Sequence, residues 1–164
     1  MLRLRASLLA ICLLVSSPVP GGSPIPSFLW AVQPLIGTGQ SSAYGVTMDH
    51  SGNTFVCGQF TDTLTLTTGT IRATGLTFPG NTDVFLVKYA TNGDVLWARN
   101  GGNATLGSNE VGYAVAVDAA GNAYVTGEYS GATATSFGGI QIAATGGGTV
   151  AVKYNSSGTV HWAK

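Results

Sequence analysis

Short runs of β-branched and aromatic residues alternate with turn residues along most of the chain. Between the runs lie Gly, Asn, Asp and Ser residues, which accept positive φ or hydrogen-bond to their own backbone. After residue 21 no stretch shows the periodicity of an amphipathic helix. The pattern predicts an all-β protein of antiparallel hairpins, with strands at residues 43–49, 53–60, 83–90, 94–100, 113–118, 122–129, 149–154 and 159–164.

The run at residues 83–90 is apolar on both faces of the predicted strand. Val84 and Leu86 point to one side, and Phe85, Val87 and Tyr89 point to the other. A strand that is apolar on both sides must be covered on both sides. We therefore expect this strand to lie between two further layers of the protein.

The run at residues 113–118 predicts a different arrangement, with a large and a small face. Tyr113, Val115 and Val117 share one face, whereas Ala114 and Ala116 share the other. Small residues on one face allow a neighbouring sheet to approach closely. Blades stacked face to face around an axis satisfy both strand patterns. A β-sandwich is the main alternative, but it predicts one polar face per strand.

The chain also resembles itself. Residues 44–60 and 113–129 are 69 positions apart and identical at seven of 17 positions, and residues 87–99 and 152–164 are 65 apart and identical at seven of 13. A Trp-Ala pair occurs at Trp30, Trp97 and Trp162. A repeat of this length is typical of solenoids, propellers and arrays. We predict two four-stranded antiparallel propeller-like blades, an incomplete β-propeller, at residues 30–100 and 101–164.

The first 21 residues have the layout of a secretory signal peptide. Arg3 and Arg5 precede an apolar run at residues 6–15, which is shorter than the roughly 20 residues needed to span a bilayer. We expect cleavage after Gly21, followed by a Pro/Gly-rich linker at residues 22–29. A buried or amphipathic first helix is the alternative. The bulky Ile11 before Cys12 argues against a lipid anchor.

The composition indicates the cellular compartment and excludes one class of partner. Only 9% of the residues are charged, against roughly 25% in an average protein, and the formal net charge is zero. This argues against nucleic-acid binding, which needs many basic side chains. Removal of the leader leaves five basic and seven acidic residues, and Cys57 as the single cysteine. We predict a secreted or cell-envelope protein without a transmembrane anchor or an internal disulfide.

Residues 118–127, 83–89 and 93–98 carry a resemblance to the bacterial secreted β-propeller repeat family, often called SBBP repeats. The similarity covers Trp30 to Lys164. It implies export and a propeller-blade fold, and it implies no shared chemistry, because the family is defined by its blades. The chain holds two repeats, whereas propellers usually need about four to eight blades. We therefore expect further blades, or self-association of several copies, to close a propeller.

The acidic residues give no catalytic pattern. Asp49 and Asp118 hold equivalent places beside Gly-Asn turns, which predicts turn capping in both repeats. Glycosidase chemistry would need two carboxylates across one bond, and a calcium loop would need several closely spaced oxygen ligands. The seven acids are Asp49, Asp62, Asp83, Asp94, Glu110, Asp118 and Glu128.

The remaining candidate residues favour structural roles. His50 and His161 have no partner at zinc-ligand spacing, and Cys57 lies inside a predicted strand as a buried thiol. Lys88 and Lys153 each precede a Tyr, which predicts a packed stem with the ammonium in solvent or beside a carboxylate. The tryptophans could stack on sugars, but their fixed place in the repeat favours packing between blades.

We therefore predict no catalytic, cofactor-binding or metal-binding residues. The expected function is that of an exported non-catalytic scaffold, adhesion or binding module for an unknown protein or glycan. One alternative is that the blades belong to a larger polysaccharide-active enzyme whose catalytic residues lie outside this chain, and another is a homo-oligomeric lectin. Residues 61–82 and 130–148 differ most between the repeats and are the best candidate binding surface, because variable loops often carry function.

Overall fold

The computed structural model describes residues 40–66, 81–103, 107–143 and 146–164 in full. It also gives the backbone of four further strands: β1 (Ile11–Ser16), β2 (Pro26–Val32), β3 (Leu35–Ile36) and β7 (Gly69–Arg72). These parts of the chain are all-β, as predicted, and contain no helix that could cross a membrane. Residues 1–10 and 17–25 lie outside the described residues, so the signal peptide and its cleavage site stay predictions.

The first large sheet contains four strands from the first repeat and a hairpin from the second. Its order is β13-β12-β9-β8-β5-β4, and every neighbouring pair is antiparallel. The strands are β4 (Ser41–Met48), β5 (Thr54–Phe60), β8 (Asp83–Tyr89), β9 (Val95–Gly102), β12 (Thr135–Phe137) and β13 (Ile140–Ile142). The prediction of four strands was wrong for this sheet, because β12 pairs with the end of β9 at Gly101 and Gly102.

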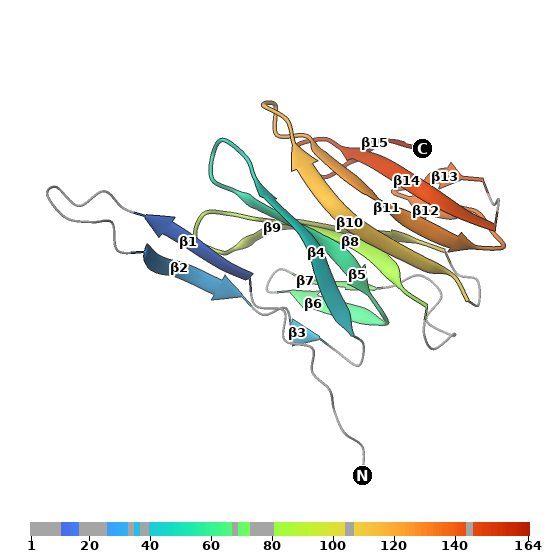
Figure 1. Cartoon of the computed structure of the whole chain (residues 1–164), viewed down its shortest axis with the longest axis horizontal. Helices are drawn as coiled ribbons and strands as arrows, with labels where there is room; N and C mark the ends of the chain where they lie inside the picture. The colour runs from blue at the N-terminus through green and yellow to red at the C-terminus, as the bar shows by residue number, and fades with distance from the viewer. Residues whose placement is uncertain are drawn as a thin grey trace, which may run out of the picture.

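The second large sheet has the predicted four strands, in the order β10-β11-β14-β15. They are β10 (Asn109–Val117), β11 (Ala123–Gly131), β14 (Gly146–Tyr154) and β15 (Val160–Ala163). The described residues also form two smaller sheets: β1 with β2, and β6 (Thr63–Leu66) between β3 and β7. The two large sheets lie next to each other, with β4 beside β10 (Figure 1).

The two large sheets share the same pairing register, including two β-bulges each. The slips lie between Ala43 and Gly45, Lys88 and Tyr89, Gly112 and Ala114, and Lys153 and Tyr154. The first and third slips are 69 residues apart, and the second and fourth are 65 apart, which are the two spacings seen in the sequence. The chain therefore forms the same hairpins, with the same irregularities, twice.

The bulge in β10 places Tyr113 differently from the sequence prediction. Tyr113 sits at the slip, is 46% exposed and contacts the ring of Tyr44 at 5.7 Å between centroids. Val115 and Val117 share one face, as predicted, and pack against the core. The expectation that a neighbouring sheet approaches the small face was wrong, because the larger valines face the first sheet and Ala114 and Ala116 are exposed. The strict alternation failed at Tyr113 because the extra residue of a bulge shifts the side-chain phase.

The main hydrophobic core lies between the two large sheets. The first sheet contributes Phe55, Cys57, Val84, Leu86 and Phe137, and the second contributes Ala123, Val125, Tyr129, Val150, Val152 and Tyr154. A second cluster covers the opposite face of the first sheet and includes Leu64 and Leu66 of β6. All seven residues of β8 are buried, so this strand is covered on both faces, as its sequence predicted.

Candidate functional site

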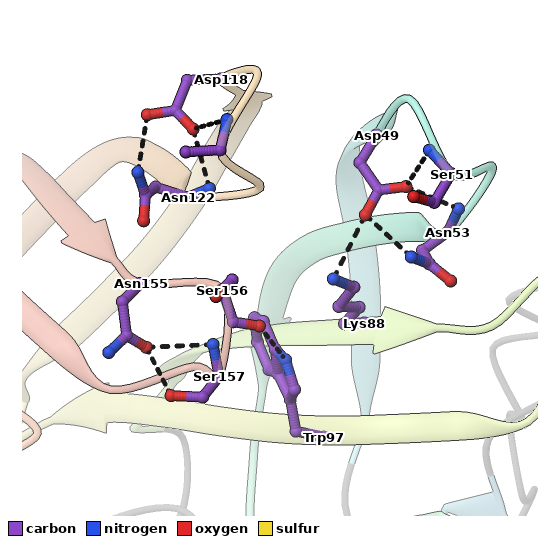
Figure 2. A network of polar contacts seen from close by, with 11 residues as sticks. Asp49, Ser51, Asn53, Lys88, Trp97, Asp118, Asn122, Asn155, Ser156 and Ser157 are labelled. Carbon is purple, nitrogen blue, oxygen red and sulfur yellow. Dashed lines mark hydrogen bonds and ion pairs between the residues drawn. The ribbon is translucent and has the colours of Figure 1, made fainter.

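The turn between β4 and β5 is built on Asp49. Its Oδ1 atom accepts hydrogen bonds from the backbone N–H groups of Ser51, at 3.0 Å, and Asn53, at 2.9 Å (Figure 2). Its Oδ2 atom accepts a third from Asn53 Nδ2 at 2.9 Å. Asp49 therefore caps this turn, the role that its position in the repeat predicted.

The same arrangement recurs at Asp118 in the second sheet. Asp118 Oδ1 accepts from the backbone N–H groups of Ala120, at 3.0 Å, and Asn122, at 2.9 Å, and Oδ2 accepts from Asn122 Nδ2 at 2.8 Å. Asn155 Oδ1 accepts two backbone N–H groups of the turn between β14 and β15. Three acceptor side chains thus close three neighbouring turns at one end of the sheets (Figure 2).

Lys88 is the third partner of the Asp49 carboxylate. Its Nζ lies 3.2 Å from Asp49 Oδ2 and 4.8 Å from the centroid of the Phe55 ring, and the side chains of both ion-pair members are 9% exposed. Burial by itself raises the pKa of Asp49, but hydrogen bonds from Asn53 and the charge of Lys88 outweigh it, so the pKa lies below its usual value. The lysine therefore holds its stem in the protein and its ammonium beside a carboxylate, as predicted.

In the second sheet a tyrosine hydroxyl takes the place of the ion pair. Tyr124 donates its O–H to Asp118 Oδ2 at 3.0 Å, and Lys153 Nζ lies 5.1 Å from the Tyr124 ring centroid. The hydrogen bonds from Asn122 are the main reason that the pKa of Asp118 is lowered. The pKa of Lys153 is raised, chiefly through its hydrogen bond with Tyr124. Both sheets thus place a lysine, an aromatic ring and an aspartate together.

Trp97 and Arg99 of β9 bind the β14–β15 turn of the other sheet. Trp97 Nε1 donates to the carbonyl of Ser156 at 3.1 Å. Arg99 donates from Nε to the carbonyl of Gly158 at 2.7 Å and from Nη2 to the carbonyl of Ser157 at 3.1 Å. Two side chains of the first sheet therefore satisfy three consecutive carbonyls of the second, which fixes how the sheets stack.

Trp97 and Trp162 each lie near the equivalent aromatic ring of their own sheet. The Trp97 ring lies 5.8 Å from the Phe55 ring, and the Trp162 ring lies 6.2 Å from the Tyr124 ring, measured between centroids. Trp97 also packs against the core between the sheets, so the predicted packing role is confirmed for this residue. The side chain of Trp30 lies outside the described residues.

A small cleft, here called the turn cleft, lies where the capped turns of the two sheets meet. It has a volume of about 210 Å³. Its lining is polar on the first-sheet side and small on the second-sheet side: Asp49, His50, Ser51, Asn53, Lys88, Ala119, Ala120, Gly121 and Ser156. The carboxylate and ammonium in this cleft are already paired with each other, which leaves little free charge to hold a ligand.

A larger hollow, here called the far-face hollow, lies on the face of the second sheet that points away from the first sheet. Its volume is about 470 Å³. It is lined by Tyr113, Thr126, Gly127, Glu128, Thr149, Val150, Ala151 and Lys164. Tyr113 donates its O–H to Glu128 Oε2 at 3.3 Å across this surface. The hollow is open and mixed in polarity, and it offers hydroxyl groups, an aromatic ring and a cation.

At the opposite end from the capped turns, a carboxyl group is fully buried between the sheets. Glu110 Oε1 accepts hydrogen bonds from Asn103 Nδ2 and Thr135 Oγ1, both at 3.0 Å. No described residue hydrogen-bonds Oε2. Burial raises the pKa of Glu110 to about 8; the hydrogen bond from Thr135 lowers it, and the nearby charge of Asp83 raises it further.

Sequence reasoning missed this buried acidic pair. Asp83, like Glu110, has no exposed surface. A signal was present, because both acids break the repeat: Gly148 stands at the position equivalent to Asp83, and Ser41 at the position equivalent to Glu110. Acids shared by both repeats cap turns, whereas these two unshared acids are buried.

His50 and Cys57 lie where the sequence predicted. His50 is exposed in its turn, and Cys57 is buried, donating weakly to the carbonyl of Gly112 at 3.5 Å. Burial raises the pKa of the Cys57 thiol to about 12, which makes it a poor nucleophile at neutral pH. Within the described ranges, no group of three or more His, Cys, Asp or Glu side chains could hold a metal ion.

The two variable segments have different places in the fold. Residues 61–82 include β6, which covers the first sheet, and residues 130–148 include β12 and β13, which extend it. The side chains of residues 67–80 and all of residues 144–145 lie outside the described residues. The prediction that these segments form a binding surface therefore stays a prediction.

No protein-family model matches the chain. A search of curated proteins also finds no match. The resemblance to secreted propeller repeats therefore stays a prediction from the residues that carry it.

Proposed function

We propose that the chain is an exported, non-catalytic repeat scaffold, or a section of one, whose β units stack like propeller blades and serve surface display, adhesion or binding of a protein or glycan. The contact that carries the proposal is the one between Trp97 and Arg99 and the turn carbonyls of the next sheet. It joins two copies of one hairpin arrangement through side chains that recur in the sequence as Trp162 and Lys164. A contact made from repeated parts can be extended to further units.

The exchange of hairpins between units supports the same proposal. The second unit's β12 pairs with β9 at Gly101 and Gly102, four and five residues after Trp97. In the same way, β6 of the first unit pairs with β3 at Leu35 and Ile36, shortly after Trp30. Each hairpin thus joins the strand that ends the preceding Trp-containing segment. Such sharing favours a row of mutually dependent units over two independent domains.

The positions of the carboxylates favour a structural or binding role over hydrolysis. Asp49 and Asp118 are occupied by turn N–H groups, and Asp83 and Glu110 have no exposed surface where a substrate could reach them. A glycosidase holds both of its carboxylates at the scissile bond. A purified full chain should therefore bind a protein or glycan without releasing reducing sugar from a panel of polysaccharides. Release of sugar would support the enzyme alternative.

Export is the part of the proposal that is tested most directly. The full chain is expressed with its own leader in a Gram-negative bacterium, and cytosolic, envelope and medium fractions are analysed by intact mass. We expect protein that begins at Gly22 in the envelope or the medium. A matched Leu9→Arg, Leu13→Arg variant interrupts the apolar run and should stay uncleaved in the cytosol. Uncleaved wild-type chain in the cytosol would contradict the proposal.

A further inference from the structure

The far-face hollow is the counterpart, residue by residue, of the surface with which the first sheet binds the second. Thr126 stands where the first sheet has Cys57, and Thr149 stands where it has Val84. Cys57 and Val84 are 0% and 1% exposed because β10 covers them, whereas both threonines are exposed. The second sheet therefore presents an empty version of a binding surface that is filled elsewhere in the same molecule.

Residues at the edge of the hollow also have counterparts in the surface with which the first sheet binds the second. Lys164, which lines the hollow, stands at the position of Arg99, whose side chain donates to two turn carbonyls of the adjacent sheet. Tyr113 of the hollow stands at the position of Tyr44, whose ring contacts the next unit. A cation and an aromatic ring are thus available at the places where the filled surface uses them.

The opposite end of the molecule exposes the matching partner surface. Val46 and Met48 of β4 are 62% and 49% exposed, although they are large and apolar. Their counterparts in β10, Val115 and Val117, pack against the core between the two sheets. The first sheet therefore leaves uncovered the strand face that the second sheet buries.

The turn next to this strand also matches. Gly93 donates its N–H to the carbonyl of Ala90, just as Gly158 donates to that of Asn155, and the two glycines have φ values of 88° and 82°. The β8–β9 turn therefore displays its carbonyls with the same geometry as the β14–β15 turn that Trp97 and Arg99 bind.

We propose that the far-face hollow binds β4 and the β8–β9 turn of a second copy of this chain, so that copies associate head to tail. The proposal rests on the proposed function in taking the stacking of successive units as the mode of assembly. Similarity to the contact inside the chain identifies the occupant. The exposed Val46 and Met48 of β4 are the counterparts of the β10 residues that pack against the first sheet. In the complex, the Thr126 hydroxyl donates to the carbonyl of Ala43 in the second copy, as Cys57 does to Gly112 within the chain.

The composition of the hollow sets the strength of this association. Two threonines replace a cysteine and a valine, so less apolar surface is removed from water than between the sheets of one chain. The contact should therefore be reversible and depend on protein concentration. The contact uses two different surfaces, so a pair of bound copies still has one free surface of each kind. Further copies can therefore add, which leads to rings or to open chains.

The test uses two variants of the full chain that each disable one surface. Thr126→Arg fills the hollow, and Val46→Lys places a charge on the exposed face of β4. Sedimentation equilibrium over a range of concentrations should show multiples of the chain mass for the wild type and single chains for each variant. An equimolar mixture of the two variants should form a dimer, because one has an intact β4 face and the other an intact hollow.

The controls separate the alternatives. Gln141→Arg adds a charge at an exposed position of β13 outside both surfaces and should associate like the wild type. If either variant fails to fold, as judged by circular dichroism, Thr149→Lys or Met48→Glu replaces it. A wild type that stays single at all concentrations, or variants whose mixture does not associate, would overturn the proposal. A chain that is exported but never associates would leave the proposed function standing, and a cytosolic chain that associates would do the reverse.

Discussion

The two large sheets share their register, bulges and capped turns, yet they hold the capping aspartate differently. In the first sheet Lys88 forms a buried ion pair with Asp49, and in the second the Tyr124 hydroxyl binds Asp118. The bonds from the turn backbone to the carboxylate are the same in both. The shared element is thus the hydrogen-bonded turn, and the third partner of the carboxylate can be a cation or a hydroxyl.

The sheets also differ in what covers equivalent faces. The face of the first sheet that carries Cys57 is buried under β10, and the equivalent face with Thr126 is exposed. The residues differ accordingly: the buried position holds an apolar thiol, and the exposed position holds a polar hydroxyl. Register is therefore fixed within each sheet, whereas burial depends on the neighbour.

The largest effect should come from a glycine that both sheets require. A Cβ atom on Gly58 would collide with the carbonyl of Ser42, and one on Gly127 would collide with the carbonyl of Val111. We expect Gly58→Ala and Gly127→Ala each to lower the free energy of unfolding by roughly 3 kcal/mol, as measured by urea denaturation. Gly148→Ala, where the nearest atom would lie 3.4 Å from the added Cβ, is the matched control and should cost less. A much smaller loss in only one sheet would show that the bulges are not equivalent.

The next effect separates the two lysines. Lys88→Met leaves the buried Asp49 carboxylate without its cation, and we expect a loss of about 2 kcal/mol in thermal or urea unfolding. Lys153→Met should cost clearly less, because the Tyr124 hydroxyl still binds Asp118. Equal losses for the two variants would contradict the different roles that the structure gives these lysines.

A pH-dependent effect should come from Glu110, which has no counterpart in the first sheet. Its pKa is about 8 in the folded chain and 4.5 as a free side chain, so the folded protein binds this proton more tightly. The free energy of unfolding should therefore fall as pH rises between these values, by roughly 1.4 kcal/mol per pH unit, and level off above pH 8.

Glu110→Gln should remove this decline and raise the stability at pH 9 relative to the wild type. The readout is the urea midpoint measured from pH 5 to about pH 9. Glu128→Gln, an exposed acid of the same sheet, is the matched control and should keep the decline. A decline that persists in Glu110→Gln would assign it to other groups.

The sequence predicted those features that depend on neighbouring residues. All eight expected strands overlap observed strands, and the turn roles of Asp49 and Asp118 follow from the local Asp-x-x-Gly-Asn pattern. The burial of both faces of β8 follows from its run of large apolar residues. These features are set by pairing and periodicity within a few residues.

The features that were missed depend on contacts between distant segments. The pairing of β12 with β9 joins residues more than 30 positions apart, and nothing in the sequence of β12 specifies this edge. The approach of Glu110 to Asp83 likewise requires the two sheets to be stacked first. Neither acid is shared between the two units, which distinguishes both from the turn-capping aspartates. This difference did not indicate that the two acids lie close together.

Thiol labelling tests the central claim most directly. The claim is that the second sheet covers the Cys57 face of the first sheet, whereas the equivalent Thr126 face of the second sheet is exposed. The full chain with Cys12→Ser reports on Cys57, and a chain with Cys12→Ser, Cys57→Ala and Thr126→Cys reports on the equivalent position of the second sheet. At low protein concentration, we predict that Cys57 reacts with a maleimide only when the protein unfolds, whereas the cysteine at position 126 reacts within the native protein. Native labelling of both thiols at similar rates would contradict the stacked arrangement.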